Sequence, residues 1–157
     1  MQVLRVGRIV EYRTGLLAEF TAPKALSILH GKKARIDYLL AFNAGDFRAN
    51  GLGATADLTA RWTGFLAPQL AGRYRLVFVA SGPVVVRIDE KLVILNMPRR
   101  DVVIALSDKP IAIGVEFKCK NTEEHSLNLL WSIAGSTLEE PIPPEVFFHD
   151  RKLGKSP

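Results

Sequence analysis

Alternation of apolar and polar residues at every second position is the feature that most constrains how this chain can fold. A period of two places the apolar side chains on one face of a β-strand and the polar ones on the other. The pattern is clear in four runs, residues 58–66, 73–80, 111–118 and 126–133. Val84, Val86 and Ile88 continue it. The sequence therefore predicts a domain of half-buried strands.

Turn-forming residues separate these runs. They occupy residues 68–72, 81–83, 107–110 and 120–125, and they are rich in Pro, Gly, Ser, Asp and Asn. Short strands with such punctuation are typical of an antiparallel β-sandwich or barrel, which is the predicted fold class.

The first third of the chain is less regular. Residues 3–12 and 16–20 predict strands, residues 25–30 and 36–42 fit a strand or a helix, and residues 43–57 predict a long loop.

Length and hydropathy predict one domain with a sizeable core, since the chain has 157 residues. No apolar run approaches the roughly 20 residues of a membrane helix, so no membrane span is expected. The N-terminus does not have the pattern of a signal peptide.

The net charge is +5 and the pI about 9.6, which favours acidic partners. The basic residues are scattered, however, as on an ordinary solvated surface. Tyr74 stands between Arg73 and Arg75 but shares its face with Leu76 and Phe78, so we expect it in the core. Nucleic-acid binding, which would need an exposed aromatic ring among basic residues, is therefore disfavoured. Trp62 and Trp131 also lie on apolar faces and are expected in the core.

Motifs for catalysis or for a metal are absent from the sequence. No GxSxG nucleophile motif occurs, and His30, His125 and His149 lack the spacing of a zinc-binding helix. The single cysteine, Cys119, cannot form an internal disulfide. We therefore expect neither an enzyme nor a cofactor.

Six segments, in order, resemble the PA14 domain family. They are GLLAEF (15–20), ARWTGFLAPQLAGRYRLVF (60–78), VVVRIDEKLVI (84–94), KPIAIGVEF (109–117), LNLLWSIAG (127–135) and EEPIPPEVFF (139–148). The resemblance implies an antiparallel β-sandwich or barrel over residues 15–148, and we expect an extension or edge strand before it (1–14) and a flexible tail after it (149–157). It also implies a non-catalytic, carbohydrate-binding-like module of extracytoplasmic proteins, at the cell surface or in the periplasm.

One corner departs from the family pattern. In some members of the family, two adjacent acidic residues at this corner bind calcium. Hydroxyl groups of the sugar then complete the coordination shell of the ion. Here the aligned positions are Ser81 and Gly82, followed by Pro83. We therefore predict no calcium at this corner and place any recognition elsewhere.

Two functions remain open. The first is a structural or protein-interaction subunit of a larger assembly. Val84, Val85 and Val86 put apolar side chains on both faces of one strand, so a partner could cover Val85. The alternative is a calcium-independent module that binds glycans, possibly acidic ones. Its candidate contacts are polar residues expected in strand-end loops: Ser81, Arg87, Asn96, Arg99 and Arg100.

Overall fold

The computed structural model describes residues 2–5, 8–22, 31–42, 58–89, 91–95, 99–119, 126–133 and 135–150. These form strands β1 (Gln2–Arg5), β2 (Arg8–Thr14), β3 (Leu16–Ala22), β4 (Gly31–Asp37), β5 (Ala41–Phe42), β6 (Leu58–Leu66), β7 (Gly72–Ala80), β8 (Val84–Ile88), β9 (Lys91–Leu95), β10 (Arg99–Leu106), β11 (Ile111–Cys119), β12 (Leu127–Ile133), β13 (Glu140–Pro141) and β14 (Phe147–Asp150), with one short 3-10 helix, η1 (Pro144–Val146). Among these residues no helix is long and apolar enough to cross a membrane.

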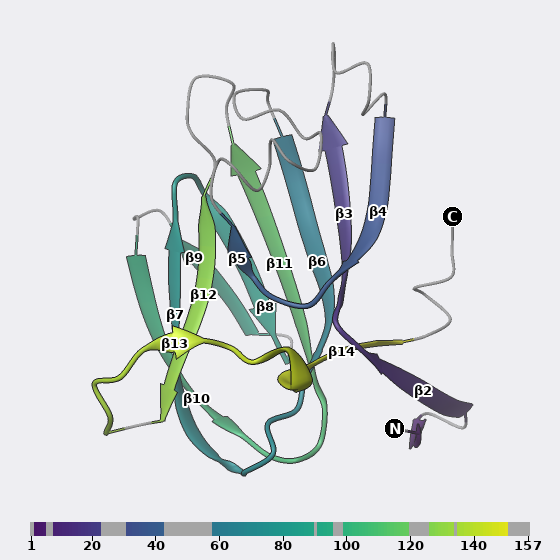
Figure 1. Cartoon of the computed structure of the whole chain (residues 1–157), viewed down its shortest axis with the longest axis vertical. Helices are drawn as coiled ribbons and strands as arrows, with labels where there is room; N and C mark the ends of the chain where they lie inside the picture. Colours follow the sequence, from purple (N-terminus) through teal and green to yellow (C-terminus); the bar gives the residue numbers. More distant parts are fainter. Residues whose placement is uncertain are drawn as a thin grey trace.

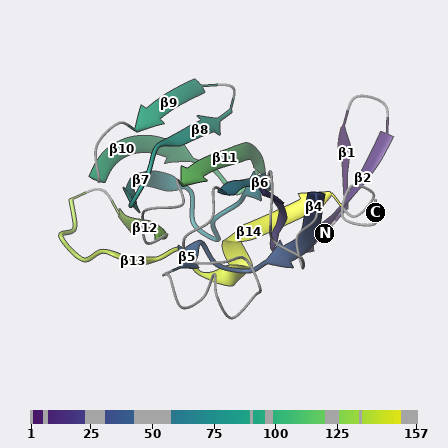
Figure 2. The same ribbon diagram turned by 90° about the horizontal axis from the view of Figure 1, so that it is seen from above.

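The strands build two antiparallel sheets that pack face to face as a sandwich (Figures 1 and 2). One sheet has nine strands in the order β1-β2-β14-β6-β11-β8-β9, with β3 beside β6 and β4 beside β3. The other has five strands in the order β10-β7-β12-β13, with β5 beside β12. The all-β prediction is confirmed.

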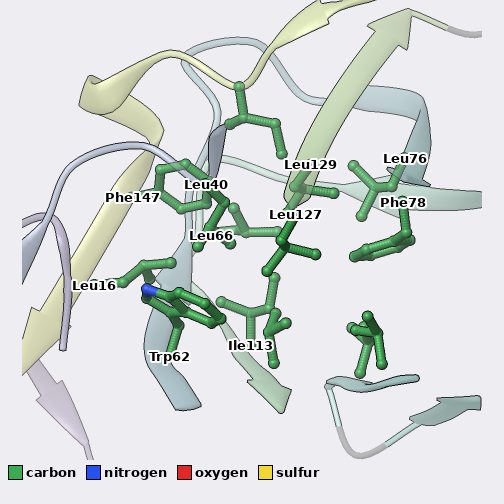
Figure 3. Close-up of a cluster of buried hydrophobic side chains, with 14 of the residues drawn as sticks. Leu16, Leu40, Trp62, Leu66, Leu76, Phe78, Ile113, Leu127, Leu129 and Phe147 are labelled. Carbon is green, nitrogen blue, oxygen red and sulfur yellow. The ribbon is translucent and has the colours of Figure 1, made fainter. Parts of the chain in front are cut away.

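The core lies between the sheets and is made of the apolar residues of the alternating runs (Figure 3). Trp62 of β6 and Ile113 of β11 face Leu76 and Phe78 of β7 and Leu129 of β12. Tyr74 and Trp131 are also buried, and their rings stack with centroids 4.6 Å apart. The prediction that both tryptophans and Tyr74 belong to the core is thus confirmed.

Several elements differ from the sequence-based expectation. Residues 3–12, expected as one strand, contribute to two, because β1 folds back on β2 as a hairpin. Residues 36–42 form no helix: 36–37 end β4, 41–42 form β5, and 38–40 connect the two strands. Strand β10 was not predicted, and Arg99 and Arg100 begin it instead of lying in a loop. The segments 25–30 and 43–57 lie outside the described residues.

The β1–β2 hairpin extends away from the sandwich and joins it through β14 (Figure 2). Gly15 turns the chain from β2 into β3 with a φ of +96°, a conformation that suits glycine. Its N–H donates to the Phe147 carbonyl over 2.7 Å. Strand β14 ends at Asp150, so the last strand runs two residues past the expected domain end at 148.

Candidate binding site

The Ser81–Pro83 corner is held by hydrogen bonds within the fold. The Ser81 N–H donates to the Ser126 carbonyl over 2.9 Å, and the Ser126 N–H donates to Ser81 Oγ over 2.9 Å. The Pro83 carbonyl accepts from the Lys118 N–H over 3.2 Å. Ser81 therefore ties the end of β7 to the start of β12. Among the described residues, no group of three His, Cys, Asp or Glu side chains could hold a metal ion.

Arg99 takes part in an ion-pair network on the outer face of the five-stranded sheet. Its guanidinium contacts both carboxylate oxygens of Glu139 and lies 3.3 Å from Asp101. Arg75 of β7 joins the same carboxylates, at 3.0 Å from Asp101 and 3.3 Å from Glu139, and donates to Ser132 Oγ over 3.0 Å. The network links β7, β10, β12 and the segment before β13, so Arg99 is engaged within the fold.

The contacts in this network shift the pKa values of Glu139 and Arg99. The hydrogen bond from Arg99 lowers the pKa of Glu139 below its ordinary value, although partial desolvation opposes the shift. The reciprocal hydrogen bond raises the pKa of Arg99. Arg100 is exposed and follows Arg99 in β10, but its alternate position directs it to the other face of the strand.

The outer face of the nine-stranded sheet brings together Val85 and Arg87, two of the residues singled out by sequence. Both belong to β8, which pairs with β11. One cross-strand row on this face consists of Leu17 of β3, Thr63 of β6, Gly114 of β11, Arg87 of β8 and Leu92 of β9. Val85 is half-buried in the neighbouring row, opposite Glu116.

Gly114 leaves a hollow in the middle of this row. A Cβ atom added at Gly114 would meet no heavy atom within 4 Å. Two adjoining hollows of about 340 and 300 Å³ share Thr63, Gly114 and Arg87 in their walls. Volumes of this order are typical of small-ligand sites. We call the two together the Gly114 hollow.

The charged groups around the Gly114 hollow differ in their pairing. Arg61 of β6 donates to Glu116 of β11 over 2.7 Å, and Lys118 lies 3.5 Å from the same carboxylate. Partial burial raises the pKa of Glu116, but the hydrogen bond and charge of Arg61, together with Lys118, outweigh it, so the pKa is lowered. Arg87 is exposed and has no ion-pair or hydrogen-bond partner among the described residues.

At its β14 end the hollow meets His149 and Asp150. Both side chains are buried. Nδ1 of His149 lies 3.1 Å from the Gly15 carbonyl oxygen, which favours the tautomer that carries the proton on Nδ1. His149 therefore fastens β14 to the β2–β3 junction. Asn96, another of the predicted contacts, lies outside the described residues.

A buried polar cluster at the β4 side of the core was not predicted. The Trp62 indole N–H donates to Asp37 Oδ2 over 2.8 Å. Arg35 Nε lies 2.7 Å from Asp37 Oδ1, and its Nη2 donates to Oδ2 over 3.3 Å. The Arg35 guanidinium also lies 4.5 Å from the centroid of the Phe20 ring. The cluster holds β4 on β6, although Arg35 Nε makes no hydrogen bond among the described residues and is paired with Asp37 only by charge.

Solved structures similar to this chain share its fold. The PA14 sugar-binding domain from an RTX adhesin superposes with a TM-score of 0.61 at 14% identity, over 87% of this chain and 98% of that domain. The fold is PA14-like. The epithelial adhesin 6 A domain from Candida glabrata, solved with Galβ1-3GlcNAc, has a TM-score of 0.66 at 12% identity over 92% of this chain and 91% of that domain.

An anti-sigma factor domain-containing protein is similar at 27% identity, with a TM-score of 0.70 over 87% of this chain. The chain spans about half of that protein, since it covers 48% of its length. No protein-family model and no curated protein matches the sequence. The neighbours of the PA14-like fold thus include sugar-binding adhesin domains and parts of longer proteins.

Gly114 and Thr63 belong to the hollow and were missed from the sequence. A glycine at an outward position of an alternating strand is a recognised sign of close approach by a ligand or another backbone. Gly114 stands at such a position between Ile113 and Val115, so this signal was present.

Proposed function

We propose that this chain is a non-catalytic recognition module of a larger protein or assembly, and that it binds through the outer face of the nine-stranded sheet. The observation that carries the proposal is the Gly114 hollow, walled by Thr63 and by Arg87, which no described residue pairs with. The Ser81 corner is instead occupied by hydrogen bonds to Ser126. In this proposal, the chain therefore binds its ligand on the sheet face and not at the corner.

The ligand that this site suits best is a carbohydrate bound without calcium. Two of the similar structures support the class, one named as a sugar-binding domain and one solved with a disaccharide. Ser81 and Gly82 provide no carboxylate for a cation at the corner. The same resemblance supports an extracytoplasmic location for the parent protein.

A second candidate is a structural or protein-interaction subunit, which was the first interpretation of the sequence. Half-buried Val85 on an outward face and the projecting β1–β2 hairpin support it. The edge of β1 that does not face β2 could add a strand to a partner sheet. In this case the outer face would be covered by another domain.

A glycan array probed with the chain, in calcium and again in chelator, separates these candidates. We expect binding that survives chelation, is lost in Gly114→Val and is kept in Ser81→Ala. Binding that requires calcium, or that Ser81→Ala abolishes while Gly114→Val keeps it, would return the site to the corner. No glycan binding, with self-association in sedimentation that Val85→Lys abolishes, would favour the assembly candidate.

A further inference from the structure

We infer that the Gly114 hollow binds a carboxylated sugar, a uronic acid unit of an oligosaccharide, and that Arg87 binds its carboxylate. The inference rests on the proposed function and names the ligand class of the same site. It follows from the shape of the hollow, from the state of Arg87 and from the pairing of the strands beneath. Each of these is an observation on the nine-stranded sheet.

The shape comes from a missing side chain. Thr63 and Arg87 flank Gly114 on the two neighbouring strands, and two strand spacings separate them by about 10 Å. Between them the floor is formed by the backbone of β11, with Ala112 and Phe65 in the next row. This floor is apolar and one side chain deep. It suits the C–H face of a sugar ring, while Thr63 Oγ1 and the Arg61–Glu116 pair at the rim can bond hydroxyls.

Arg87 gives the hollow a preference for ligands that carry a carboxylate. Arg61, Arg75 and Arg99 are each held by a carboxylate at hydrogen-bond distance, but Arg87 has no such partner in the described part of the chain. An arginine guanidinium binds a carboxylate through two parallel hydrogen bonds, and the apolar floor reduces competition from water. The site therefore presents a cation prepared for an external carboxylate.

The neighbouring acids do not cancel this charge. Glu116 is already compensated by Arg61 at 2.7 Å and by Lys118 at 3.5 Å. Asp150, at the far end of the hollow, is 4% exposed and has an interaction of its own. Beside Gly114, Arg87 is therefore a cation that no carboxylate of the described residues neutralises.

The pairing of the strands selects a sugar over an extended peptide. Strand β11 is bonded to β6 and β8, and β8 is bonded to β9 on its other side. The sheet face beneath the hollow consequently offers no free backbone groups, and an extended peptide laid across it would gain no ladder of hydrogen bonds. A sugar carries its own hydroxyls around an apolar ring face and needs no such ladder.

Calorimetric titration in chelator tests the inference. The probes are oligomers of galacturonic, glucuronic and mannuronic acid, the neutral oligomers of the parent sugars, and poly-glutamate, which has carboxylates without a sugar ring. We expect at least one uronate to bind more tightly than its neutral counterpart, with affinity that falls as salt rises. Arg87→Ala should weaken that uronate about tenfold to a hundredfold, as expected for a charged hydrogen bond.

Matched variants locate the effect. Arg73 of β7 is a suitable control, because it is exposed, lies in the other sheet and also has no partner among the described residues. Arg73→Ala should leave uronate affinity within about twofold, and Gly114→Val should abolish binding while leaving the thermal midpoint near that of the wild type. Arg87→Lys should recover only part of the affinity, since lysine lacks the planar fork.

Three results would overturn the inference. If uronates and neutral oligomers bound equally, and Arg87→Ala had no effect, the inference of an acidic ligand would be wrong. The proposed function would still stand. If poly-glutamate bound as tightly as the uronates, the inference that the ligand is a sugar would be wrong, and an acidic protein would be the better candidate. Failure of every oligosaccharide to bind the folded wild-type chain would contradict the proposed function as well.

Discussion

Arg75 and Arg99 on the outer face of one sheet differ in their pairing from Arg87 on the outer face of the other. On the five-stranded sheet, Arg75 and Arg99 share the carboxylates of Asp101 and Glu139 at distances of 3.3 Å or less. On the nine-stranded sheet, Arg87 stands beside the hollow over Gly114 and contacts no described carboxylate. Arg75 and Arg99 are thus neutralised by carboxylates close to them in the fold, whereas Arg87 remains as a cation beside a hollow.

This difference separates charges that stabilise the fold from charges that are available to a ligand. A net charge of +5 does not identify which arginines are available, because several are neutralised locally. The contrast predicts that substitutions on the five-stranded face change stability, whereas those around Gly114 change binding. The experiments below test it from the largest expected effect to the smallest.

The largest effect on stability is expected from the ion pair in the interior, between Arg35 and Asp37. Asp37→Ala should lower the free energy of unfolding by about 3 kcal/mol, because it leaves the buried Trp62 N–H and the half-buried Arg35 guanidinium without their acceptor. Urea denaturation measures the loss. Asp37→Asn keeps an oxygen for Trp62 and should lose less; equal losses in both variants would show that only the charge matters.

Two glycines on adjacent strands provide the next comparison. A Cβ at Gly64 would meet the Phe148 carbonyl oxygen at 2.2 Å and Leu16 at 2.6 Å, whereas one at Gly114 meets nothing. Gly64→Ala should therefore destabilise the chain by about 2 kcal/mol, and Gly114→Ala should change stability by less than about 1 kcal/mol. Thermal unfolding of the pair measures both. If Gly114→Ala were the more damaging, the hollow would be part of the packing and not a site.

The paired and unpaired arginines should also differ in stability. Arg75→Ala removes hydrogen bonds to Ser132 and Asp101 and should cost about 1 kcal/mol. Arg87→Ala removes no described contact and should change the free energy of unfolding by less than about 0.5 kcal/mol. Chemical denaturation of the two variants side by side gives the difference. A similar cost for both would mean that Arg87 has a structural role.

The smallest effect is a pH dependence of stability that comes from Glu139 on the five-stranded face. The folded pKa of Glu139 is lowered by Arg99, so the carboxylate stabilises the fold above its unfolded pKa, near 4.5, and this contribution is lost as pH falls through the folded value. Glu139→Gln should therefore lower the thermal midpoint at pH 7 but match the wild type near pH 2.5. A gap that persists at low pH would assign the effect to packing. Raising the salt concentration should narrow the gap at pH 7.

The alternating runs could be predicted from sequence because burial on one face of a strand leaves a local mark. Residues 58–66 and 111–118 were predicted as strands, and β6 and β11 occupy those positions. Strand β10 was missed because two of its inward residues, Val102 and Ile104, are only half-buried at the edge of the sandwich and follow two arginines. Its weak alternation gave no comparable signal.

The candidate site was only partly predictable. Val85 stood out as an outward-facing valine and Arg87 as a candidate polar contact, and both border the hollow. Ser81 and Arg99 were equally plausible contacts in the sequence, but the fold engages them with Ser126 and Glu139. Whether a polar side chain is free depends on partners 40 or more positions away, and a single sequence does not show those partners.

The sequence by itself determined that the chain is an antiparallel β-sandwich or barrel and which residues of its main strands face the core, because the period of two is a local property of the strand. Only the tertiary structure decided which outward residues are neighbours. Cross-strand pairing places Thr63 and Arg87 on either side of Gly114, although these three positions are dispersed along the chain. Since register is set by the joint packing of all strands, the hollow exists only once the sheet has formed.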